Sequence, residues 1–489
     1  MKRLVIRMHF LDSTEATLIG ACLADPSAVF YQDYDSLEWQ QMKQHITYVP
    51  IENQERYNKE MQSLINMITF SAAASLEAME HHNVIANVAT MAKNTIYYHI
   101  SNEQGDLAYK FWLARNKTDY KKICLFQNTA NNNVLVKKGA SMMLGSFPTN
   151  QVIYVPQVAK EFTLEESAKY DGLTEEGLQE ILSSNGEAPL DKRARYYMYH
   201  TREDFHVPSK EVMIRILAPY ELRVDFKTGE LRGEAMEIEN AIVHFHGGGF
   251  VCMDSASHQS YTRKWSEQLQ VPIFSIDYRL APSWPYPAAQ NDCYQAYVWL
   301  VSFAEKFLNL KVKKWFFAGD SAGGHLTVSV AELAILRGFR KPDGLFAHYP
   351  AFSLDMLFLP SNLLVLDEWL LTETFISVVF GCFTRNGGDR DRSPILSPNN
   401  APDCLIKLLP QITMTACEAD MLRDHAVYFL QRLLRADPSR DPEWSKLIYL
   451  QDYPHGFNNF DVRRIGVSEF QRGTELTVEA FRAMFNRCK

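Results

Sequence analysis

The run Phe317-Ala-Gly-Asp-Ser-Ala-Gly-Gly324 decides the fold, because it joins an apolar strand-like segment, 314–318, to an apolar helix-like segment, 322–337. Its centre, Gly319-x-Ser321-x-Gly323, has the form of a nucleophile elbow, a sharp strand-to-helix turn that exposes a serine hydroxyl. Small residues around the serine permit that strained backbone. The pentapeptide alone also fits an ordinary glycine-rich turn, so the segments on either side of it have to distinguish between these two interpretations.

Outward from this run, short apolar segments alternate with helix-like segments. The predicted strands are 211–218, 241–246, 271–277, 314–318, 344–349, 411–416 and 447–451, and the predicted helices are 258–269, 288–308, 322–337, 424–435 and 474–487. Repeated strand–helix–strand order predicts an α/β fold with a mostly parallel sheet covered by helices. Ligands of such sheets bind at the carboxyl ends of the strands, so the residues just after each strand are the candidate functional residues.

Three other predicted strands are followed by residues that suit acyl transfer. His246-Gly-Gly-Gly249 follows 241–246, Asp420 follows 411–416, and His455 follows 447–451. A serine hydroxyl is a poor nucleophile until a base removes its proton. His455 is the best candidate base, because Ser, Asp and His occur here in one of the known chain orders of a catalytic triad.

Asp420 is the candidate acid that orients the His455 ring and stabilises its cation. Asp424 and Glu418 are its rivals. Asp420 lies directly past the strand, whereas Asp424 lies one helical turn further on, where a carboxylate is typical of a helix start.

The glycines after His246 predict an oxyanion hole. A developing alkoxide needs backbone N–H donors that no other group uses, and we expect Gly248, Gly249 and Ala322 to supply them. A phosphate loop is disfavoured, since no Gly-Lys-Ser/Thr follows. His244 and His246 have no third ligand nearby, so we expect His246 to brace the loop by hydrogen bonds, and we expect neither a metal nor another cofactor.

These motifs resemble the hormone-sensitive lipase family of α/β-hydrolases. The resemblance is carried by Ile242-Val-His-Phe-His-Gly-Gly-Gly-Phe250, Asp277-Tyr-Arg-Leu-Ala-Pro282, the run 317–324, Asp420-Met-Leu422 and His455-Gly-Phe457, and 255–343 is especially similar to the eukaryotic hormone-sensitive lipases. It covers roughly 210–489 and implies an α/β-hydrolase fold and ester hydrolysis by a triad of Ser321, Asp420 and His455. Two departures stand out. Ser283 replaces the family's usual Glu, and the interval from Ser321 to Asp420 is too short for the regulatory insert of the animal enzymes.

The first part of the chain predicts a different organisation. Residues 1–200 are expected to form a helical, cap-like N-terminal domain with a connector, ahead of a catalytic domain over 201–489. The predicted helices are 54–69, 71–100 and 106–115, followed by helical pieces at 163–168 and 174–182 in a polar connector from Pro148 to Pro208. His81 and His82 are adjacent and would face different sides of a helix, which disfavours a metal pair.

Composition limits the function classes. A net charge of −8 with 46 % hydrophobic and 22 % charged residues is typical of a folded chain and disfavours a nucleic-acid partner. Eight cysteines without a CxxC pair, an opening segment unlike an export signal, and the lack of a charge-free span favour a cytoplasmic protein, with lipid-droplet or membrane-surface contact left open. The composition does not indicate an oligomeric state.

The apolar segment 351–383 bears on the substrate. It follows the strand after the elbow helix and could form an acyl-pocket wall or lid, or simply an ordinary core helix pair. A long acyl chain gains about 0.8 kcal/mol per buried CH₂, so a lipase needs such a wall. We therefore expect a hydrolase of acylglycerols or other lipid esters. The alternatives are a small-ester carboxylesterase and a non-catalytic binding or structural protein on the same fold.

Overall fold

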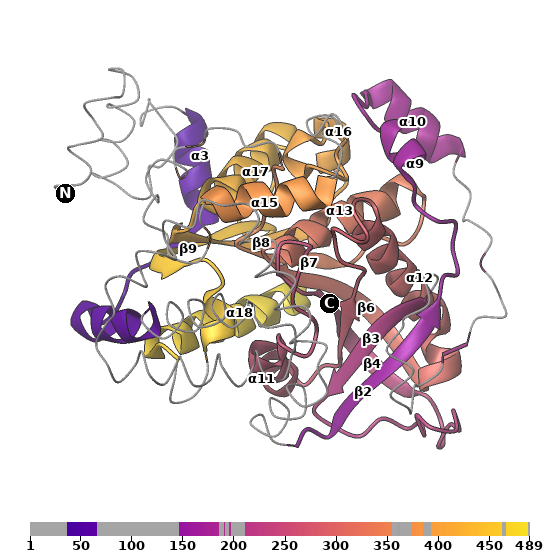
Figure 1. The fold of residues 1–489 in the computed structure, drawn as a ribbon. Helices are drawn as coiled ribbons and strands as arrows, with labels where there is room; N and C mark the ends of the chain where they lie inside the picture. Colours follow the sequence, from indigo (N-terminus) through magenta and orange to yellow (C-terminus); the bar gives the residue numbers. More distant parts are fainter. Residues whose placement is uncertain are drawn as a thin grey trace, which may run out of the picture.

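The computed structural model describes residues 37–65, 146–184, 190, 195–196, 211–354, 359, 361, 371, 373–384, 393–461 and 466–487. Within these residues the chain forms one twisted sheet with helices on both faces (Figure 1). The α/β-hydrolase fold expected from the sequence is therefore confirmed.

The described strands form a nine-stranded sheet in the order β1-β9-β8-β7-β6-β4-β5-β3-β2. Their bounds are β1 Ile46–Val49, β2 Thr149–Pro156, β3 Glu211–Ala218, β4 Met236–Phe245, β5 Ile273–Asp277, β6 Leu310–Asp320, β7 Gly344–His348, β8 Gln411–Ala419 and β9 Ser445–Pro454. Strand β3 runs antiparallel to both of its neighbours, β2 and β5, and the other pairs are parallel. The carboxyl ends of β4, β6, β8 and β9 therefore share one edge of the sheet.

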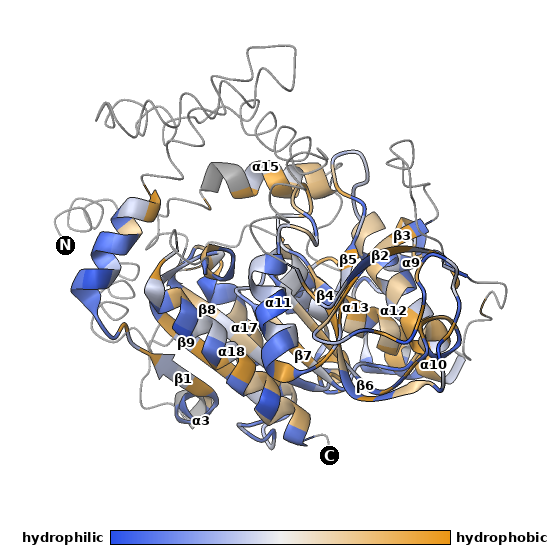
Figure 2. Ribbon diagram, turned by 90° about the horizontal axis from the view of Figure 1, so that it is seen from below, coloured by the Kyte–Doolittle hydropathy of each residue, from blue (hydrophilic) through white to orange (hydrophobic). Residues whose placement is uncertain are grey.

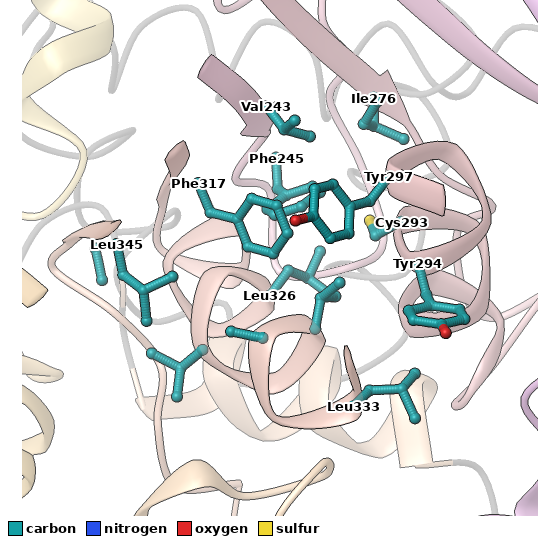
Figure 3. Close-up of a cluster of buried hydrophobic side chains, with 14 of the residues drawn as sticks. Val243, Phe245, Ile276, Cys293, Tyr294, Tyr297, Phe317, Leu326, Leu333 and Leu345 are labelled. Carbon is teal, nitrogen blue, oxygen red and sulfur yellow. The ribbon is translucent and has the colours of Figure 1, made fainter. Parts of the chain in front are cut away.

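Apolar residues alternate between the two faces of the central strands. Phe317 and Leu345 belong to one buried cluster, together with residues of the helices α12 (Ala288–Leu308), α13 (Ala322–Leu336) and α17 (Arg423–Ala436). Figure 3 shows part of this cluster, in which Leu326 and Leu333 of α13 lie below Phe317. Phe316 and Phe346 belong to a second cluster with α11 (Gln259–Leu269) and α18 (Ser468–Arg487). Burial of each large apolar side chain contributes about 1.5–3 kcal/mol to the stability of the fold. The two helical layers are therefore packed firmly against the sheet and fix the position of its strand ends.

The other described helical segments surround this core. They are α3 (Leu37–His45), 54–65, α9 (Leu164–Ala168), α10 (Glu175–Ser184), α15 (Glu373–Thr384), η3 (Pro398–Asn400), α16 (Asp403–Ile406) and η4 (Phe457–Phe460). The strands consist largely of hydrophobic residues, while helices such as α18 carry hydrophilic residues along one side (Figure 2). No helix in the described part of the chain has the length and apolar character needed to cross a membrane.

Every strand and helix predicted after residue 210 is present, but β4, β6 and α18 begin earlier than their predictions, 241–246, 314–318 and 474–487. The early start of β6 has a physical reason. Its first half alternates between partly exposed lysines and more buried residues, and Lys311 and Lys313 form ion pairs with Glu237 and Glu239 of the neighbouring β4. A search for apolar runs misses such a segment, because only its partner strand reveals that the charged side chains are paired.

The described part of 1–200 departs from the expected helical organisation. Strand β1 pairs with β9, and β2 pairs with β3, so this region adds two strands to the sheet. The region taken as a polar connector thus begins with a strand. The helical pieces at 163–168 and 174–182 correspond to α9 and α10, and 54–65 is helical. The predicted helices 71–100 and 106–115 lie outside the described residues, as does the pair His81-His82, and the division at residue 200 stays a prediction.

Candidate active site

Ser321 lies at the junction of β6 and α13 in a strained backbone conformation. Its φ of 55° and ψ of −117° are rare for a residue with a side chain. The turn fits only because its flanking residues are glycines: a Cβ on Gly319 would collide with the carbonyl oxygen of Gly323, and a Cβ on Gly323 with that of Phe245. The elbow is therefore pressed against the end of β4, which brings Ser321 beside the loop that follows β4.

Ser321, His455 and Asp420 form one hydrogen-bonded chain. The Nε2 atom of His455 lies 2.9 Å from Oγ of Ser321, and its Nδ1 lies 2.8 Å from Oδ2 of Asp420. Asp420 is fully buried, and the amide of Leu422 donates to its second oxygen at 2.8 Å. Because an ionised carboxylate only accepts hydrogen bonds, Nδ1 is the protonated nitrogen and Nε2 is the nitrogen that can accept the serine proton.

The two rival acids have other partners. Asp424 accepts a hydrogen bond from Nε of Arg423 at 2.8 Å and from the amide of Ser361 at 2.6 Å. Glu418 accepts from the amide of Asp452 at 3.0 Å. Among the three carboxylates it is therefore Asp420 that contacts His455.

The glycine loop after β4 lies next to the elbow. Gly248 has a φ of 107° and Gly249 a φ of 60°, so both occupy the left-handed region. No described residue accepts a hydrogen bond from the backbone amides of Gly248, Gly249 or Ala322. Three unengaged donors beside a serine hydroxyl are what a developing oxyanion requires.

His246 holds the loop rather than facing the serine. Its Nδ1 lies 2.7 Å from the carbonyl oxygen of Gly247, and its ring stacks on Tyr278 with a centroid separation of 4.2 Å. His244 lies between the hydroxyls of Ser275 and Tyr261. Burial lowers the pKa of both histidines. The described residues contain no group of three His, Cys, Asp or Glu side chains placed to hold a metal ion.

The fold agrees with comparisons to known proteins. A family described as having the alpha/beta hydrolase fold matches residues 242–459. Hormone-sensitive lipase of Mus musculus is 44 % identical over 147 residues, which is 30 % of this chain and 19 % of that protein. Residues 242–459 thus have the α/β-hydrolase fold, and part of the chain is similar to hormone-sensitive lipases. The chain spans 14–19 % of the length of the hormone-sensitive lipases of mouse, human and cattle.

A bacterial enzyme and a fungal crystal structure also match this chain. The carboxylic ester hydrolase LipN of Mycobacterium tuberculosis is 30 % identical over 255 residues, covering 50 % of this chain and 64 % of LipN. The crystal structure of carboxyl esterase 2 from Tuber melanosporum aligns with a TM-score of 0.48 and 25 % identity, over 57 % of this chain and 83 % of that chain.

Helix α15 packs its apolar side chains against the glycine loop of the candidate site. A Cβ on Gly249 would lie 2.5 Å from Cγ1 of Val379, so this valine packs directly on the glycine loop. Phe383 stacks on Phe250 with a centroid separation of 3.9 Å. The described part of the apolar segment 351–383 thus reaches the loop, and 355–358, 360, 362–370 and 372 lie outside the described residues.

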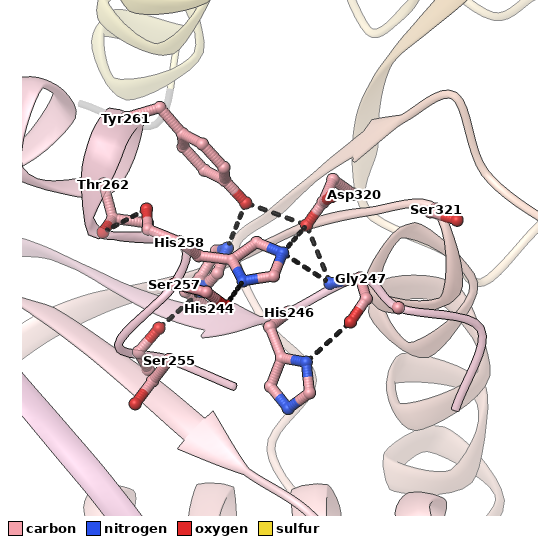
Figure 4. Close-up of polar contacts among 12 residues, drawn as sticks. His244, His246, Gly247, Ser255, Ser257, His258, Tyr261, Thr262, Asp320 and Ser321 are labelled. Atoms are coloured by element: carbon pink, nitrogen blue, oxygen red, sulfur yellow. Dashed lines mark hydrogen bonds and ion pairs between the residues drawn. The ribbon is translucent and has the colours of Figure 1, made fainter. Parts of the chain in front are cut away.

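A second polar cluster beside the candidate site was not predicted from the sequence. Asp320, His258 and Tyr261 lie buried beneath the glycine loop (Figure 4). All three residues lie within 255–343, a stretch that carried the family resemblance. The signal available in the sequence was a charged residue, Asp320, directly before the candidate nucleophile.

Proposed function

We propose that this α/β-hydrolase cleaves carboxylic esters, with Ser321 as nucleophile, His455 as general base and acid, and Asp420 as the group that orients the imidazole. The observation that carries the proposal is the unbroken chain of hydrogen bonds from Ser321 to Asp420, at 2.9 and 2.8 Å, beside backbone amides that have no acceptor among the described residues.

The proposed reaction proceeds in two halves. His455 Nε2 takes the Ser321 proton as Oγ attacks the ester carbonyl, and the resulting oxyanion accepts hydrogen bonds from the amides of Gly248, Gly249 and Ala322. The carbon–oxygen bond to the alcohol then breaks, and the imidazolium returns the proton to the leaving alkoxide. Water, activated by His455, attacks the acyl-enzyme, releases the acid and restores Ser321. Asp420 keeps Nδ1 protonated throughout and stabilises the imidazolium.

The substrate class we propose is an acylglycerol or another lipid ester. Support comes from α15, where the apolar side chains of Ile376, Val379, Phe380 and Phe383 are buried against the core that contains the glycine loop residue Phe250. A relative bearing the name hormone-sensitive lipase points in the same direction. The second candidate is a small-ester carboxylesterase. The contact between Val379 and Gly249 favours it, because this contact narrows the space beside the proposed oxyanion hole.

The decisive test is labelling of the purified protein with a fluorophosphonate, followed by ester hydrolysis across acyl chain lengths. Capture at Ser321 with turnover of emulsified acylglycerols supports the proposal. Capture with turnover of acetyl esters alone identifies the second candidate. A wild-type protein that neither reacts nor hydrolyses any ester is a binding or structural protein on this fold.

The matched pair of variants for this test is Ser321→Ala and Ser329→Ala. Both serines are buried, and Ser329 lies on α13, two turns beyond the elbow, with no hydrogen-bond partner for its hydroxyl among the described residues. Ser321→Ala should lose labelling and lower turnover by about 10³-fold or more. Ser329→Ala should keep both. Near-normal turnover of Ser321→Ala would overturn the assignment of the nucleophile.

We also propose that the enzyme acts in the cytoplasm and meets its substrate at a lipid-droplet surface. The test is flotation of the full chain with phospholipid-coated triacylglycerol droplets, in parallel with an assay on the same ester dissolved as monomers. Co-flotation with higher activity on droplets supports the proposal, and exclusion from droplets with equal activity on monomers contradicts it.

A further inference from the structure

Asp320 connects the glycine loop to the residue next to the nucleophile. It directly precedes Ser321, but its carboxylate points away from the serine towards Gly247, His258 and Tyr261 (Figure 4). Its Oδ1 accepts from the amide of Gly247 at 2.9 Å and from the hydroxyl of Tyr261 at 2.8 Å. The carboxylate is 2 % exposed, so these hydrogen bonds form without competition from water.

His258 completes the cluster, and its Nε2 faces both Asp320 and the amide of Gly247, which lies 3.2 Å away. Its Nδ1 lies 2.8 Å from the carbonyl oxygen of Asp254, which only accepts, so Nδ1 is protonated. Its Nε2 lies 3.4 Å from Oδ1 of Asp320. Burial by itself lowers the pKa of His258, but Asp320 and Asp254 together outweigh burial and raise that pKa. In turn, His258 holds the pKa of Asp320 below its usual value despite burial. Both shifts favour an imidazolium–carboxylate pair.

The remaining donors are arranged to keep Asp320 charged. Because the carboxylate only accepts, the Tyr261 hydroxyl donates to Asp320 and must accept from Nε2 of His244, 2.9 Å away. His244 then presents its unprotonated Nδ1 to the hydroxyl of Ser275. The direction of each hydrogen bond in this buried chain is therefore fixed. Ser275 donates to His244, His244 donates to Tyr261, and Tyr261 donates to Asp320.

The glycine loop is in close steric contact with Asp320 at Gly247. A Cβ on this residue would lie 2.5 Å from Oδ2 of Asp320, so backbone and carboxylate are in close contact. Gly247 immediately precedes Gly248 and Gly249, whose amides are the proposed oxyanion donors. Other hydrogen bonds hold the loop to a different part of the fold. The hydroxyl of Tyr278, the residue directly after β5, donates to the carbonyl oxygen of His246 and so does not connect the loop to the elbow.

We propose that Asp320, paired with His258, is a positioning residue that holds the amides of Gly248 and Gly249 at the correct distance from Ser321. The inference rests on the proposed ester hydrolysis and adds a role that acts on the oxyanion alone. Neither the nucleophilicity of Ser321 nor the binding of the uncharged ester requires this carboxylate, so its loss should affect the transition state selectively.

The test compares Asp320→Asn with Glu332→Gln. Glu332 is a fully buried carboxyl on α13 whose two oxygens have no hydrogen-bond partner among the described residues, so Glu332→Gln controls for replacing a buried carboxyl with an amide. In Asp320→Asn, the charged acceptor of the Gly247 amide is replaced by a neutral side-chain amide, while the existing contact from the Gly247 amide to Nε2 of His258 at 3.2 Å remains. The loop is then held less firmly.

Three measurements separate positioning from a general structural role. For Asp320→Asn we expect kcat on p-nitrophenyl butyrate to fall by about 10–100-fold with KM unchanged, less than the 10²–10³-fold effect of removing an oxyanion donor outright. The affinity for a boronic acid, which forms a tetrahedral adduct with Ser321, should fall by the same factor. The affinity for an ether analogue, which cannot form an oxyanion, should stay constant. Glu332→Gln should leave all three values at wild-type levels.

Hydrogen exchange gives a readout that does not depend on catalysis. Amides in the peptide 246–253 should exchange faster in Asp320→Asn than in wild type. If the wild-type protein hydrolyses no ester, the proposed function fails, while the exchange rates still decide whether Asp320 holds the loop. Unchanged kcat, a parallel change in KM, or unchanged exchange would overturn the proposal. If Asp320→Asn does not fold, as judged by circular dichroism, His258→Gln should show the same selective loss to a smaller extent.

Discussion

Nδ1 of His455 lies 2.8 Å from Oδ2 of Asp420, whereas Asp424, one helical turn later, faces Arg423. Two buried carboxylates so close in sequence thus have different partners. One contacts the imidazole and the other an arginine at the start of α17. The pair permits a direct test of which carboxylate supports catalysis.

Asp420→Asn should reduce kcat by roughly 10⁴-fold, because an amide in this place favours the wrong imidazole tautomer and cannot stabilise its cation. Asp424→Asn should cost far less activity and should instead lower the melting temperature, since Arg423 loses a buried partner. Steady-state kinetics and thermal unfolding of both variants check the ranking. The reverse order of kcat would identify Asp424 as the acid.

Gly248→Ala should abolish most activity. The residue has a φ of 107°, and a Cβ there would collide with the carbonyl oxygen of Cys252, so the loop must shift and displace the proposed oxyanion donors. We expect kcat to fall by about 10²–10³-fold.

Gly381→Ala is the matched control for Gly248→Ala. Gly381 lies within α15, and a Cβ there has nothing within 4 Å, so alanine should raise stability by about 0.5–1 kcal/mol. Equal kinetics for the two variants would contradict the assigned role of the loop.

Val379→Ala should change acyl specificity. Removing its methyl groups opens space beside Gly249, so kcat/KM for a branched acyl ester should rise relative to the acetyl ester, by about 10-fold. Val298→Ala, at a fully buried position in α12, should lower stability and leave this ratio unchanged. A constant ratio in Val379→Ala would show that α15 does not border the acyl group.

Acid should destabilise the protein through buried neutral histidines. Burial lowers the pKa of His325 from 6.5 to about 4. The unfolded chain therefore binds a proton that the folded chain does not, and stability falls as the pH drops from about 6.5 to about 4. This one group should cost about 2 kcal/mol between pH 7 and pH 5.

His325→Asn should reduce this acid sensitivity. The asparagine amide keeps a donor near the carbonyl oxygen of Ala351, which lies 2.9 Å from Nδ1 of His325, but it does not titrate. Urea unfolding of wild type and variant at pH 7 and pH 5 measures the difference. An equal loss of stability in both proteins would show that His325 is not responsible.

The sequence by itself determined the parts of the protein that rest on local chemistry. The strand–turn–helix run around Ser321 needs glycines on both sides for steric reasons, and the five consecutive residues 319–323 contain them. The apolar period of the central strands and helices is likewise local, because each buried element must present an apolar face. Together they predicted the α/β fold and placed Ser321, His455 and the glycine loop at strand ends that share one edge of the sheet.

Only the tertiary structure decided features that depend on a partner distant in the chain. Strands β1 and β2 carry no strong pattern of their own and exist because β9 and β3 offer free edges. The contacts of Asp420 and of Asp424 differ through side-chain direction at the end of β8, which composition does not encode. The link from Asp320 to Gly247 joins residues 73 positions apart. A hydrogen bond of a few ångströms between such residues forms only after the sheet has brought β4 and β6 side by side.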